Sequence, residues 1–197
     1  AFYMDIYEVT NAAYKACVEE GVCTPPHNTS SSMRDSYYGN SEFDNYPVIY
    51  VGWNQANAYC EWRGASLPTE AQWEKAARAS DGLTYPWGER IDCDRANYSG
   101  CVGDTTQVGS YESGKSPYGI YDLAGNVWEW VADWYSETYY QNSPSENPSG
   151  PSSGQYRVLR GGSWNYNDYV ARSAYRNFYS PDDFIYDVGF RCARSIP

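Results

Sequence analysis

The chain has 197 residues, a formal net charge of −11, and an aromatic content that includes 22 Tyr and 8 Trp. Its length suits one domain. The acidic balance argues against nucleic acid or an anionic membrane as partner, because both attract basic patches. No apolar run is long enough to span a bilayer, and no signal-peptide pattern is found. We therefore expect neither nucleic-acid binding nor membrane insertion.

Three helices are predicted in the first 80 residues. Thr10 is placed to cap a helix over residues 11–20, before Gly21. A second helix is predicted over 54–63. Thr69 and Gln72 form a capping-box pattern that predicts a third helix ending near residue 79. A capped helix start explains this last segment without a catalytic role for its glutamates.

The rest of the chain predicts short strands separated by Gly, Pro, Asn and Tyr. The strands are expected at 47–51, 107–111, 127–130, 156–160 and 188–192, and residues 1–5 resemble the middle of another. Residues 143–154 are a Pro/Ser/Gly loop. Helices followed by short strands and long loops predict an α+β domain with much irregular structure, covering residues 1–197.

The six cysteines form a readable pattern. Cys17 and Cys23 are close enough in sequence to close a loop, as are Cys93 and Cys101, which leaves Cys60 and Cys192. Six cysteines allow fifteen connectivities, so spacing alone does not fix the pairing. Zinc is disfavoured because there is no Cys-x-x-Cys and only one His. Disulfides predict an oxidising location: extracellular, cell-surface or periplasmic.

The C-terminal segment has the residue alphabet of a binding surface. Between Arg160-Gly-Gly-Ser-Trp164 and Gly189-Phe-Arg-Cys192 lies a run dense in Tyr, Asn, Asp, Phe and Ser. Tyr provides large contact area at low entropic cost, and the small polar residues provide adaptable hydrogen bonds. The same alphabet is poor for a buried strand pair, which would alternate apolar and polar residues. We call residues 164–187 the tail.

Several motifs resemble the formylglycine-generating enzyme (sulfatase-modifying factor) family. They are Tyr7-Glu-Val-Thr-Asn11, Leu67-Pro-Thr-Glu70, Trp73-Glu-Lys-Ala-Ala-Arg78, Tyr85-Pro-Trp-Gly88, Gly119-Ile-Tyr-Asp-Leu-Ala-Gly-Asn-Val-Trp-Glu-Trp130, Arg160-Gly-Gly-Ser-Trp164 and Gly189-Phe-Arg-Cys192. They cover nearly the whole chain in the family's order. The resemblance implies a variant of the C-type lectin fold, without the family's usual first hairpin. It also implies a disulfide between Cys60 and Cys192.

The same resemblance implies structural calcium. The ligands would be the side chains of Asp122 and Glu129 and the carbonyls of Gly125 and Val127, a donor set suited to a hard cation. The simpler alternative is a tight turn capped by Asp122. A second family site would lie at Asn97 and Tyr98, with Asp104, although this loop is short and carries Cys93 and Cys101.

The family's enzymatic chemistry lacks its residues here. The resemblance implies two copper-binding cysteines in the region of Arg172 to Arg176, yet no cysteine lies between Gly161 and Arg191. Ser and Ala cannot replace soft thiolates as ligands of Cu(I). The iron-binding His cluster of related sulfoxide synthases cannot come from one His. We therefore expect no copper and no enzyme of either known type.

The tail instead resembles the variable proteins of diversity-generating retroelements, in which adenine-directed mutagenesis rewrites Asn (AAC) codons. Changing the two adenines of AAC never yields Lys, Glu, Gln, Met or Trp. Residues 165–187 contain none of these in 23 positions, whereas the other 174 residues contain 30, so about four would be expected from ordinary composition. The alternative is a family member whose loop drifted after losing activity.

Both interpretations predict recognition of a macromolecular ligand, with protein favoured, through the tail. Trp128 and Trp130 are expected in the core, and Trp164 either there or in contact with ligand. Asp187 is expected to add polar specificity. The predicted ligand-binding residues are Tyr166, Asp168, Tyr169, Tyr175, Phe178, Tyr179, Ser180, Asp183, Phe184 and Tyr186. Two rivals stay open: an enzyme with a different site in the same cleft, and a regulatory pseudoenzyme that binds a sulfatase-like peptide.

Overall fold

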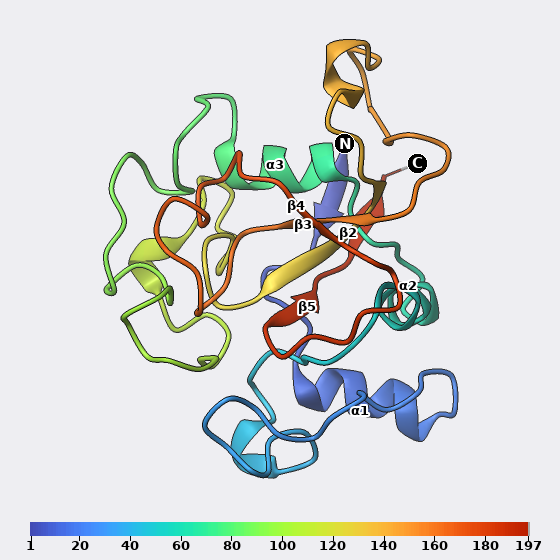
Figure 1. Ribbon diagram of the computed structural model, residues 1–197, viewed down its shortest axis with the longest axis vertical. Coiled ribbons are helices and arrows are strands. Elements are labelled where there is room, and N and C mark those ends of the chain that lie inside the picture. The colour runs from blue at the N-terminus through green and yellow to red at the C-terminus, as the bar shows by residue number, and fades with distance from the viewer. Residues whose placement is uncertain (197) are drawn as a thin grey trace.

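A four-stranded sheet forms the centre of the molecule in the computed structural model, which describes residues 1–196 (Figure 1). Its order is β4 (Asn177–Tyr179), β3 (Arg157–Arg160), β2 (Trp128–Trp134), β5 (Val188–Phe190). β2 pairs antiparallel with β3 and parallel with β5, and β3 pairs antiparallel with β4. A second antiparallel pair joins β1 (Phe2–Met4) to β6 (Ala193–Ser195), so the two ends of the chain lie side by side.

The three predicted helices are confirmed within a residue or two at each end. They are α1 (Asn11–Glu19), α2 (Trp53–Trp62) and α3 (Glu70–Arg78). Thr10 caps α1 by accepting from the Ala13 amide, and Thr69 caps α3 by accepting from the Gln72 amide. Short 3-10 turns lie at η1 (Ser41–Phe43), η2 (Glu112–Gly114) and η3 (Tyr139–Gln141). The mixture is the expected α+β domain.

The helices cover opposite faces of the sheet. Val158 of β3 packs with Trp73 of α3, whereas the next residue, Leu159, joins the larger core cluster that includes Tyr59 and Cys60 of α2. This division follows from the alternation of side chains along a strand. Figure 1 shows α3 on one side of the sheet and α1 on the other. Trp128 and Trp130 are fully buried, as predicted.

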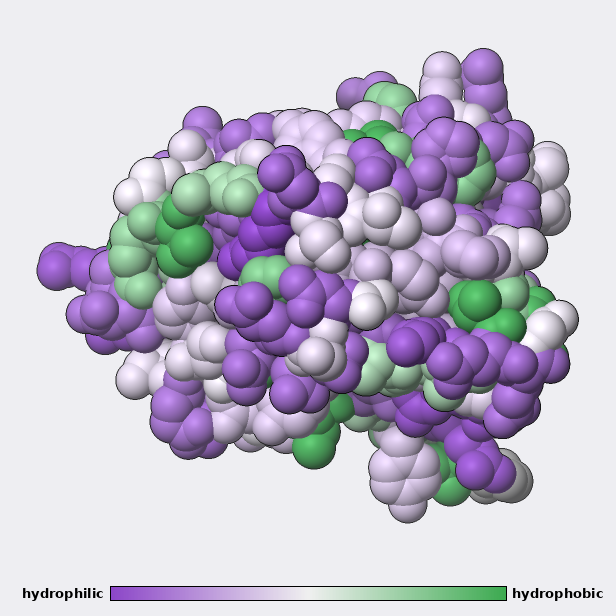
Figure 2. Space-filling view, turned by 90° about the horizontal axis from the view of Figure 1, so that it is seen from below, coloured by the Kyte–Doolittle hydropathy of each residue, from purple (hydrophilic) through white to green (hydrophobic). Residues whose placement is uncertain are grey.

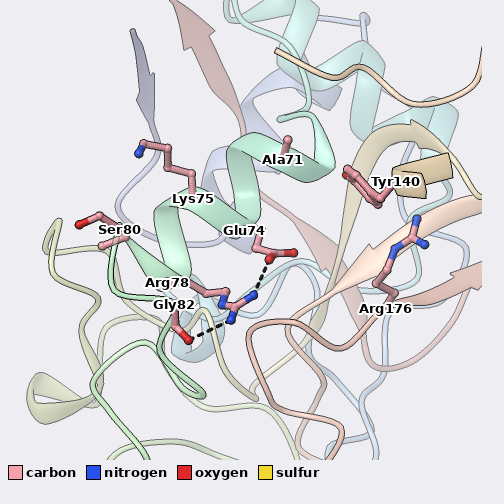
Figure 3. A pocket seen from close by; sticks show the side chains of 9 residues that line it. Ala71, Glu74, Lys75, Arg78, Ser80, Gly82, Tyr140 and Arg176 are labelled. Atoms are coloured by element: carbon pink, nitrogen blue, oxygen red, sulfur yellow. Dashed lines mark hydrogen bonds and ion pairs between the residues drawn. The ribbon is translucent and has the colours of Figure 1, made fainter. Parts of the chain in front are cut away.

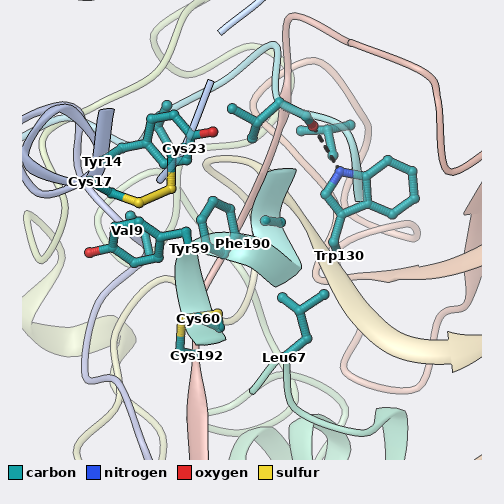
Figure 4. Packing of buried hydrophobic residues seen from close by; sticks show 14 of the residues in the cluster. Val9, Tyr14, Cys17, Cys23, Tyr59, Cys60, Leu67, Trp130, Phe190 and Cys192 are labelled. Carbon is teal, nitrogen blue, oxygen red and sulfur yellow. Dashed lines mark hydrogen bonds between the residues drawn. A yellow bond between two sulfur atoms is a disulfide. The ribbon is translucent and has the colours of Figure 1, made fainter. Parts of the chain in front are cut away.

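Three disulfides join the helices and loops to this core. They are Cys17–Cys23, Cys60–Cys192 and Cys93–Cys101, which confirms the predicted pairing. Figure 4 shows Tyr14, Tyr59 and Phe190 packed beside the first two bridges. The pairing indicates folding in an oxidising compartment.

Two predicted strands are wrong. The backbone amides of residues 48 and 50 donate hydrogen bonds to the carbonyls of Val9 and Ile185, two distant segments rather than one neighbouring strand. Tyr50 also has φ of 57°. The segment is buried as predicted, but it is not a strand. Residues 107–111 form a turn around Gly109, whose amide donates to Asp122. In both segments, side chains and main chain from distant loops replace a neighbouring strand.

The C-terminal strand and the tail also differ from expectation. The predicted strand at 188–192 divides, because β5 ends at Phe190 and β6 begins at Ala193 with a different partner. The tail contains β4, which pairs with β3 although its residue alphabet does not predict a strand. β4 is an edge strand and only partly buried, so strict apolar alternation is not required.

The face drawn in Figure 2 is mostly polar, and its hydrophobic residues form small separate patches among hydrophilic ones. Within residues 1–196, no helix has the length and apolar character needed to cross a membrane. Pro197, the last residue of the predicted domain, lies outside the described residues.

Candidate functional site: the tail surface and its frame

The tail leaves β3 through a turn that only glycine fits. Gly161 and Gly162 have φ of 96° and 74°, and a Cβ on Gly162 would lie 3.0 Å from the Cα of Ala171. This close approach folds the tail back across its own start. The chain then runs through β4 and returns to β5, so both ends of the tail are held by the central sheet.

A buried hydrogen bond links the residue just before the tail to the last residue of the tail. Ser163 Oγ donates to Asp187 Oδ2 at 2.6 Å, and both residues are buried. Burial raises the pKa of Asp187 to about 6. The expectation that Asp187 contributes polar specificity to the ligand surface is therefore wrong, since this carboxyl faces inward. Trp164 is 6% exposed and belongs to the core side of the tail.

Four of the predicted ligand residues form one aromatic cluster. Tyr166 and Tyr175 lie against Trp128, with ring centroids 5.5 and 6.1 Å away. Tyr169 packs edge-on against Tyr175 at 5.6 Å and is 54% exposed. The Tyr166 and Tyr179 hydroxyls are 3.3 Å apart. We call Tyr166, Tyr169, Tyr175 and Tyr179 the tyrosine cluster.

The hydroxyl groups of this cluster add polar atoms to an aromatic surface. The hydrogen bond with Tyr179, and then burial, raise the pKa of the Tyr166 phenol above its usual range. Neutral phenols both donate and accept hydrogen bonds, while their rings present flat apolar area. The cluster thus combines contact area with adaptable hydrogen bonding, which suits macromolecular recognition.

The other six predicted residues are more scattered. Phe178 packs against Tyr135 and Tyr156, on the opposite face of the sheet from Tyr179 because side chains alternate along β4. Phe184 stacks on His27 at 4.8 Å, and the Tyr186 ring lies 5.7 Å from the Trp164 ring. Asp168 is exposed, while Ser180 and Asp183 join one another in a turn. The tail therefore presents more than one face.

Two tail residues that sequence reasoning left out of the surface belong to it. The exposed Arg172 guanidinium lies over the Tyr169 ring at 4.5 Å, and exposed Asn165 donates to the Tyr186 hydroxyl at 2.8 Å. Arg172 is not among the ten predicted ligand residues. Its spacing of three from Tyr169 was the available signal for a contact between the two.

Arg176 anchors the middle of the tail to α3. Its Nε and Nη2 donate to the two carboxylate oxygens of Glu70 at 2.6 and 2.8 Å. Arg160 Nη1 donates to the same buried carboxylate at 2.6 Å. One guanidinium from β3, just before the tail, and one from the middle of the tail therefore share Glu70, and this fixes the tail relative to the helix.

A pocket of about 450 Å³ adjoins this anchor. Its wall is the outer face of α3, with Glu74 and Arg78, and Tyr140 and Arg176 lie on the other side (Figure 3). Arg176 is its one tail residue, and none of the ten predicted ligand residues lines it. The predicted binding surface is thus open surface rather than this cavity.

The region expected to hold copper ligands carries none of the required thiols. Ser173 is buried there, and its amide donates to the Thr84 carbonyl. All six cysteines of the chain are in disulfides. The donor set at this position does not suit Cu(I), which prefers thiolates.

The predicted calcium residues lie in a buried, acidic environment. Glu129 is fully buried and accepts from Arg191 Nε and Nη2 at 2.7 Å each, and from Trp73 Nε1. Burial, together with Asp122 and Glu129, raises the pKa of nearby Glu8 well above its usual range. Burial also raises the pKa of Asp122 to about 6. Three carboxyl groups therefore surround a single guanidinium.

These carboxyl groups could bind a cation only together with main-chain carbonyl oxygens. Across residues 1–196, no three His, Cys, Asp or Glu side chains are arranged to hold a metal ion. A calcium ion here would need the carbonyls of Gly125 and Val127, as the sequence analysis expects. At the second position, Asn97 is buried and its Oδ1 has no hydrogen-bond partner, whereas Asp104 is paired with Arg34.

The family described as "Sulfatase-modifying factor enzyme 1-like domain" matches residues 1–196. The chain belongs to this family. It is 39% identical over its full length to "Serine/threonine-protein kinase pkn1" of Chlamydia pneumoniae, of which it covers 33%. It is 42% identical, over 76% of its length, to the "Formylglycine-generating enzyme" of Streptomyces coelicolor, of which the match covers 52%. The chain thus spans a third to a half of these relatives.

Family members include enzymes and an inactive protein. "Inactive C-alpha-formylglycine-generating enzyme 2" of mouse is 41% identical over 76% of this chain and 49% of its own length. Family membership alone therefore does not assign catalysis to this chain. The match to this family and the similarity to a solved structure confirm the C-type lectin-like fold that the sequence predicts.

The solved structures that resemble this chain include variable proteins. "Treponema denticola variable protein 1" superposes with a TM-score of 0.81 at 26% identity, covering 98% of this chain and 84% of that one. "Major Tropism Determinant I1 Variant" shares the fold with a TM-score of 0.57 at 17% identity, over 99% of this chain and 50% of that one. The resemblance to variable proteins of diversity-generating retroelements is therefore present in the fold as well as in the motifs.

Proposed function

We propose that this domain is the ligand-binding module of a diversity-generating retroelement variable protein, and that it binds a protein ligand through the tail. The observation that carries the proposal is the tyrosine cluster. Tyr166 and Tyr175 pack on the buried Trp128, and Tyr169 packs on Tyr175 and is largely exposed. Tyr-rich surfaces of this kind are typical of binding sites for proteins.

The support beneath the cluster favours a surface whose side chains vary. Ser163, Asp187 and Arg176 hold the tail through buried contacts that do not involve the cluster. The Cys60–Cys192 disulfide ties the chain just after β5, the strand that follows the tail, to α2. A frame fixed in this way keeps the backbone in place when exposed residues change, and preorganisation lowers the cost of binding.

The gene neighbourhood tests this proposal. We expect a reverse transcriptase gene and a near-copy of the tail-coding sequence with adenines at the codons of Tyr169 and the other exposed tail residues. Sequencing the gene from many cells of one population should reveal variation at those codons and none at the codons of Ser163 and Arg176. A locus without either feature, and a population without such variation, would contradict the proposal.

A second candidate function is favoured by one observation, the 42% identity to a formylglycine-generating enzyme. Under this alternative the chain would oxidise a cysteine in a peptide to an aldehyde, with dissolved O2 as oxidant and loss of the sulfur as sulfide, or bind a sulfatase-like peptide without turnover. A cysteine-containing sulfatase peptide is incubated in air with the protein, Cu(I) and a reductant, and aldehyde is measured. Aldehyde above the no-protein control supports the enzyme, and tight peptide binding without aldehyde supports the pseudoenzyme.

Calcium is proposed as a structural ion at Asp122 and Glu129, with the carbonyls of Gly125 and Val127. The three buried carboxyl groups near one guanidinium support a further positive charge here. Calcium prefers carboxylate and carbonyl oxygens, and this set offers both. The ion would stiffen the turn that leads into β2, whose first residue, Trp128, packs against Tyr166 and Tyr175.

A further inference from the structure

Asp104 is one of the residues expected to hold a second calcium ion, but its carboxylate is already saturated. It is 1% exposed. Oδ2 accepts from Ser31 Oγ at 2.6 Å and from the Met33 amide at 2.8 Å, and Oδ1 accepts from the Thr105 amide at 2.7 Å. Arg34 Nη1 lies 3.0 Å from Oδ2. One carboxylate is thus matched by one guanidinium, whereas three carboxyl groups share Arg191 at the Asp122 position, so no negative charge is left over here for a metal ion.

Arg34 is held in a built site of its own. Its guanidinium lies over the rings of Phe43 and Tyr46, 4.8 and 5.0 Å from their centroids. Nη2 donates to the Thr105 carbonyl at 3.0 Å, and Nη1 to Thr105 Oγ1 at 3.2 Å. Cation–π contact, a buried ion pair and directed hydrogen bonds together favour a fixed, desolvated guanidinium.

The remaining donors at this position are neutral. Asn97 Oδ1 is buried without a hydrogen-bond partner, and the Tyr98 carbonyl accepts from the Cys101 amide. Protein calcium sites rely on carboxylate oxygens, and affinity depends on how many are present. One free amide oxygen does not replace the carboxylate that Arg34 has taken.

We propose that the Arg34 guanidinium is a built-in replacement for a cation at this position, so that the domain binds no calcium at Asn97, Tyr98 and Asp104. The positive charge then comes from the loop before η1, and it ties that loop to residues 97–105. The same loop carries His27, which stacks on Phe184 of the tail. One side of the tail surface is thereby supported without a metal ion.

The test counts calcium ions bound by the folded protein with native mass spectrometry and follows thermal unfolding with and without millimolar calcium. Replacing Asp104 by Asn in the wild-type background should leave the calcium count unchanged. Arg34→Gln frees Asp104, so it should gain one ion per chain and recover part of its lost thermal stability when calcium is added. Arg34→Gln combined with Asp104→Asn should lose that recovery.

Arg34→Lys is the matched control, because it keeps the charge and should gain no ion. A wild-type count that falls by one in Asp104→Asn would overturn the proposal, and so would an Arg34→Gln protein that folds but gains no ion. If Arg34→Gln does not fold, the comparison of wild type with Asp104→Asn still decides. A wild-type count of zero contradicts the calcium proposed at Asp122 while supporting the role of Arg34.

Discussion

Arg176 and Glu70 join the tail to α3 through two hydrogen bonds, from Nε and Nη2 to the two carboxylate oxygens. Glu70 is 1% exposed and also accepts a hydrogen bond from Arg160, whose side chain is fully buried. Glu70 therefore pairs with two guanidinium groups, Arg160 just before the tail and Arg176 in its middle, and Glu74 supplies a second negative charge to Arg160. This pairing explains how a segment rich in Tyr, Asn and Ser keeps one backbone path.

Removing this carboxylate should cost much more than removing its neighbour. Glu70→Ala leaves the buried Arg160 charge without its main partner, and we expect a loss of about 3–5 kcal/mol in the free energy of unfolding. Glu74→Ala is the matched control. Glu74 also pairs with Arg160, but a third of its side chain is exposed, so about 1 kcal/mol is expected. Urea unfolding of both variants measures the difference, and equal losses would contradict this role of Glu70.

Calcium should stabilise the wild-type protein. Because the ion would bind the folded state only, saturating calcium raises the unfolding temperature and a chelator lowers it. Asp122→Ala should abolish this response, because it removes the ligating oxygens of one side chain. Asp182→Ala alters an exposed tail carboxylate and should leave the response intact. Differential scanning calorimetry with and without chelator measures the shift, and an Asp122→Ala protein that still responds to calcium would exclude this site.

The elements that local sequence predicts are those stabilised by local contacts. Thr69 and Gln72 satisfy one another's backbone groups, so α3 begins where the pattern places it. Residues 47–51 show the limit of such reasoning. Their apolar run predicts burial correctly, but the amide of Tyr50 bonds to Ile185, 135 residues away, and no periodicity encodes that partner. Burial could be predicted here, and pairing could not.

The site divides in the same way. The tyrosine alphabet predicts a binding surface, but the position of each ring depends on distant residues. Tyr179 and Phe178 are neighbours in sequence, yet they face opposite sides of the sheet because β4 pairs with β3. Asp187 looks like one more polar surface residue in a polar run. Its burial depends on Ser163, 24 residues earlier, which the composition of the tail does not reveal.

The buried Asp187 should make stability depend on pH. Its pKa is about 6 in the folded protein and about 3.9 in an unfolded chain, so folding favours the protonated form. The stabilisation is fully present below about pH 4 and is lost as pH rises through 6. The loss is up to roughly 3 kcal/mol by pH 7.

Asp187→Asn should make this dependence shallower without removing it, because burial also raises the pKa of Asp122 to about 6. The amide stays neutral at every pH, and its oxygen can still accept from Ser163. Urea unfolding at several values between pH 4 and 7 would compare the slope with that of wild type, with Asp182→Asn as the exposed control. A slope in Asp187→Asn as steep as that of wild type would show that this carboxyl is not the titrating group.

The proposed display function requires that exposed cluster residues be replaceable without loss of fold. Tyr169 is 54% exposed, and Tyr169→Ser should change the free energy of unfolding by no more than about 0.5 kcal/mol. Tyr175 is half-buried against Trp128, so Tyr175→Ser should cost about 1–3 kcal/mol. The two rings touch one another, which makes them a matched pair.

The same distinction should hold for whole libraries. Residues that AAC-derived codons encode, placed together at Asp168, Tyr169 and Phe184, should leave most displayed clones folded, as measured by protease resistance on the cell surface. The same residues placed at Ser163, Arg176 and Asp187 should leave few clones folded. Ser163 and Asp187 form one buried hydrogen bond, and Arg176 pairs with the buried Glu70. Equal tolerance at the two sets would mean that the tail has no fixed frame. A diversified binding surface could not then keep its shape from one variant to the next.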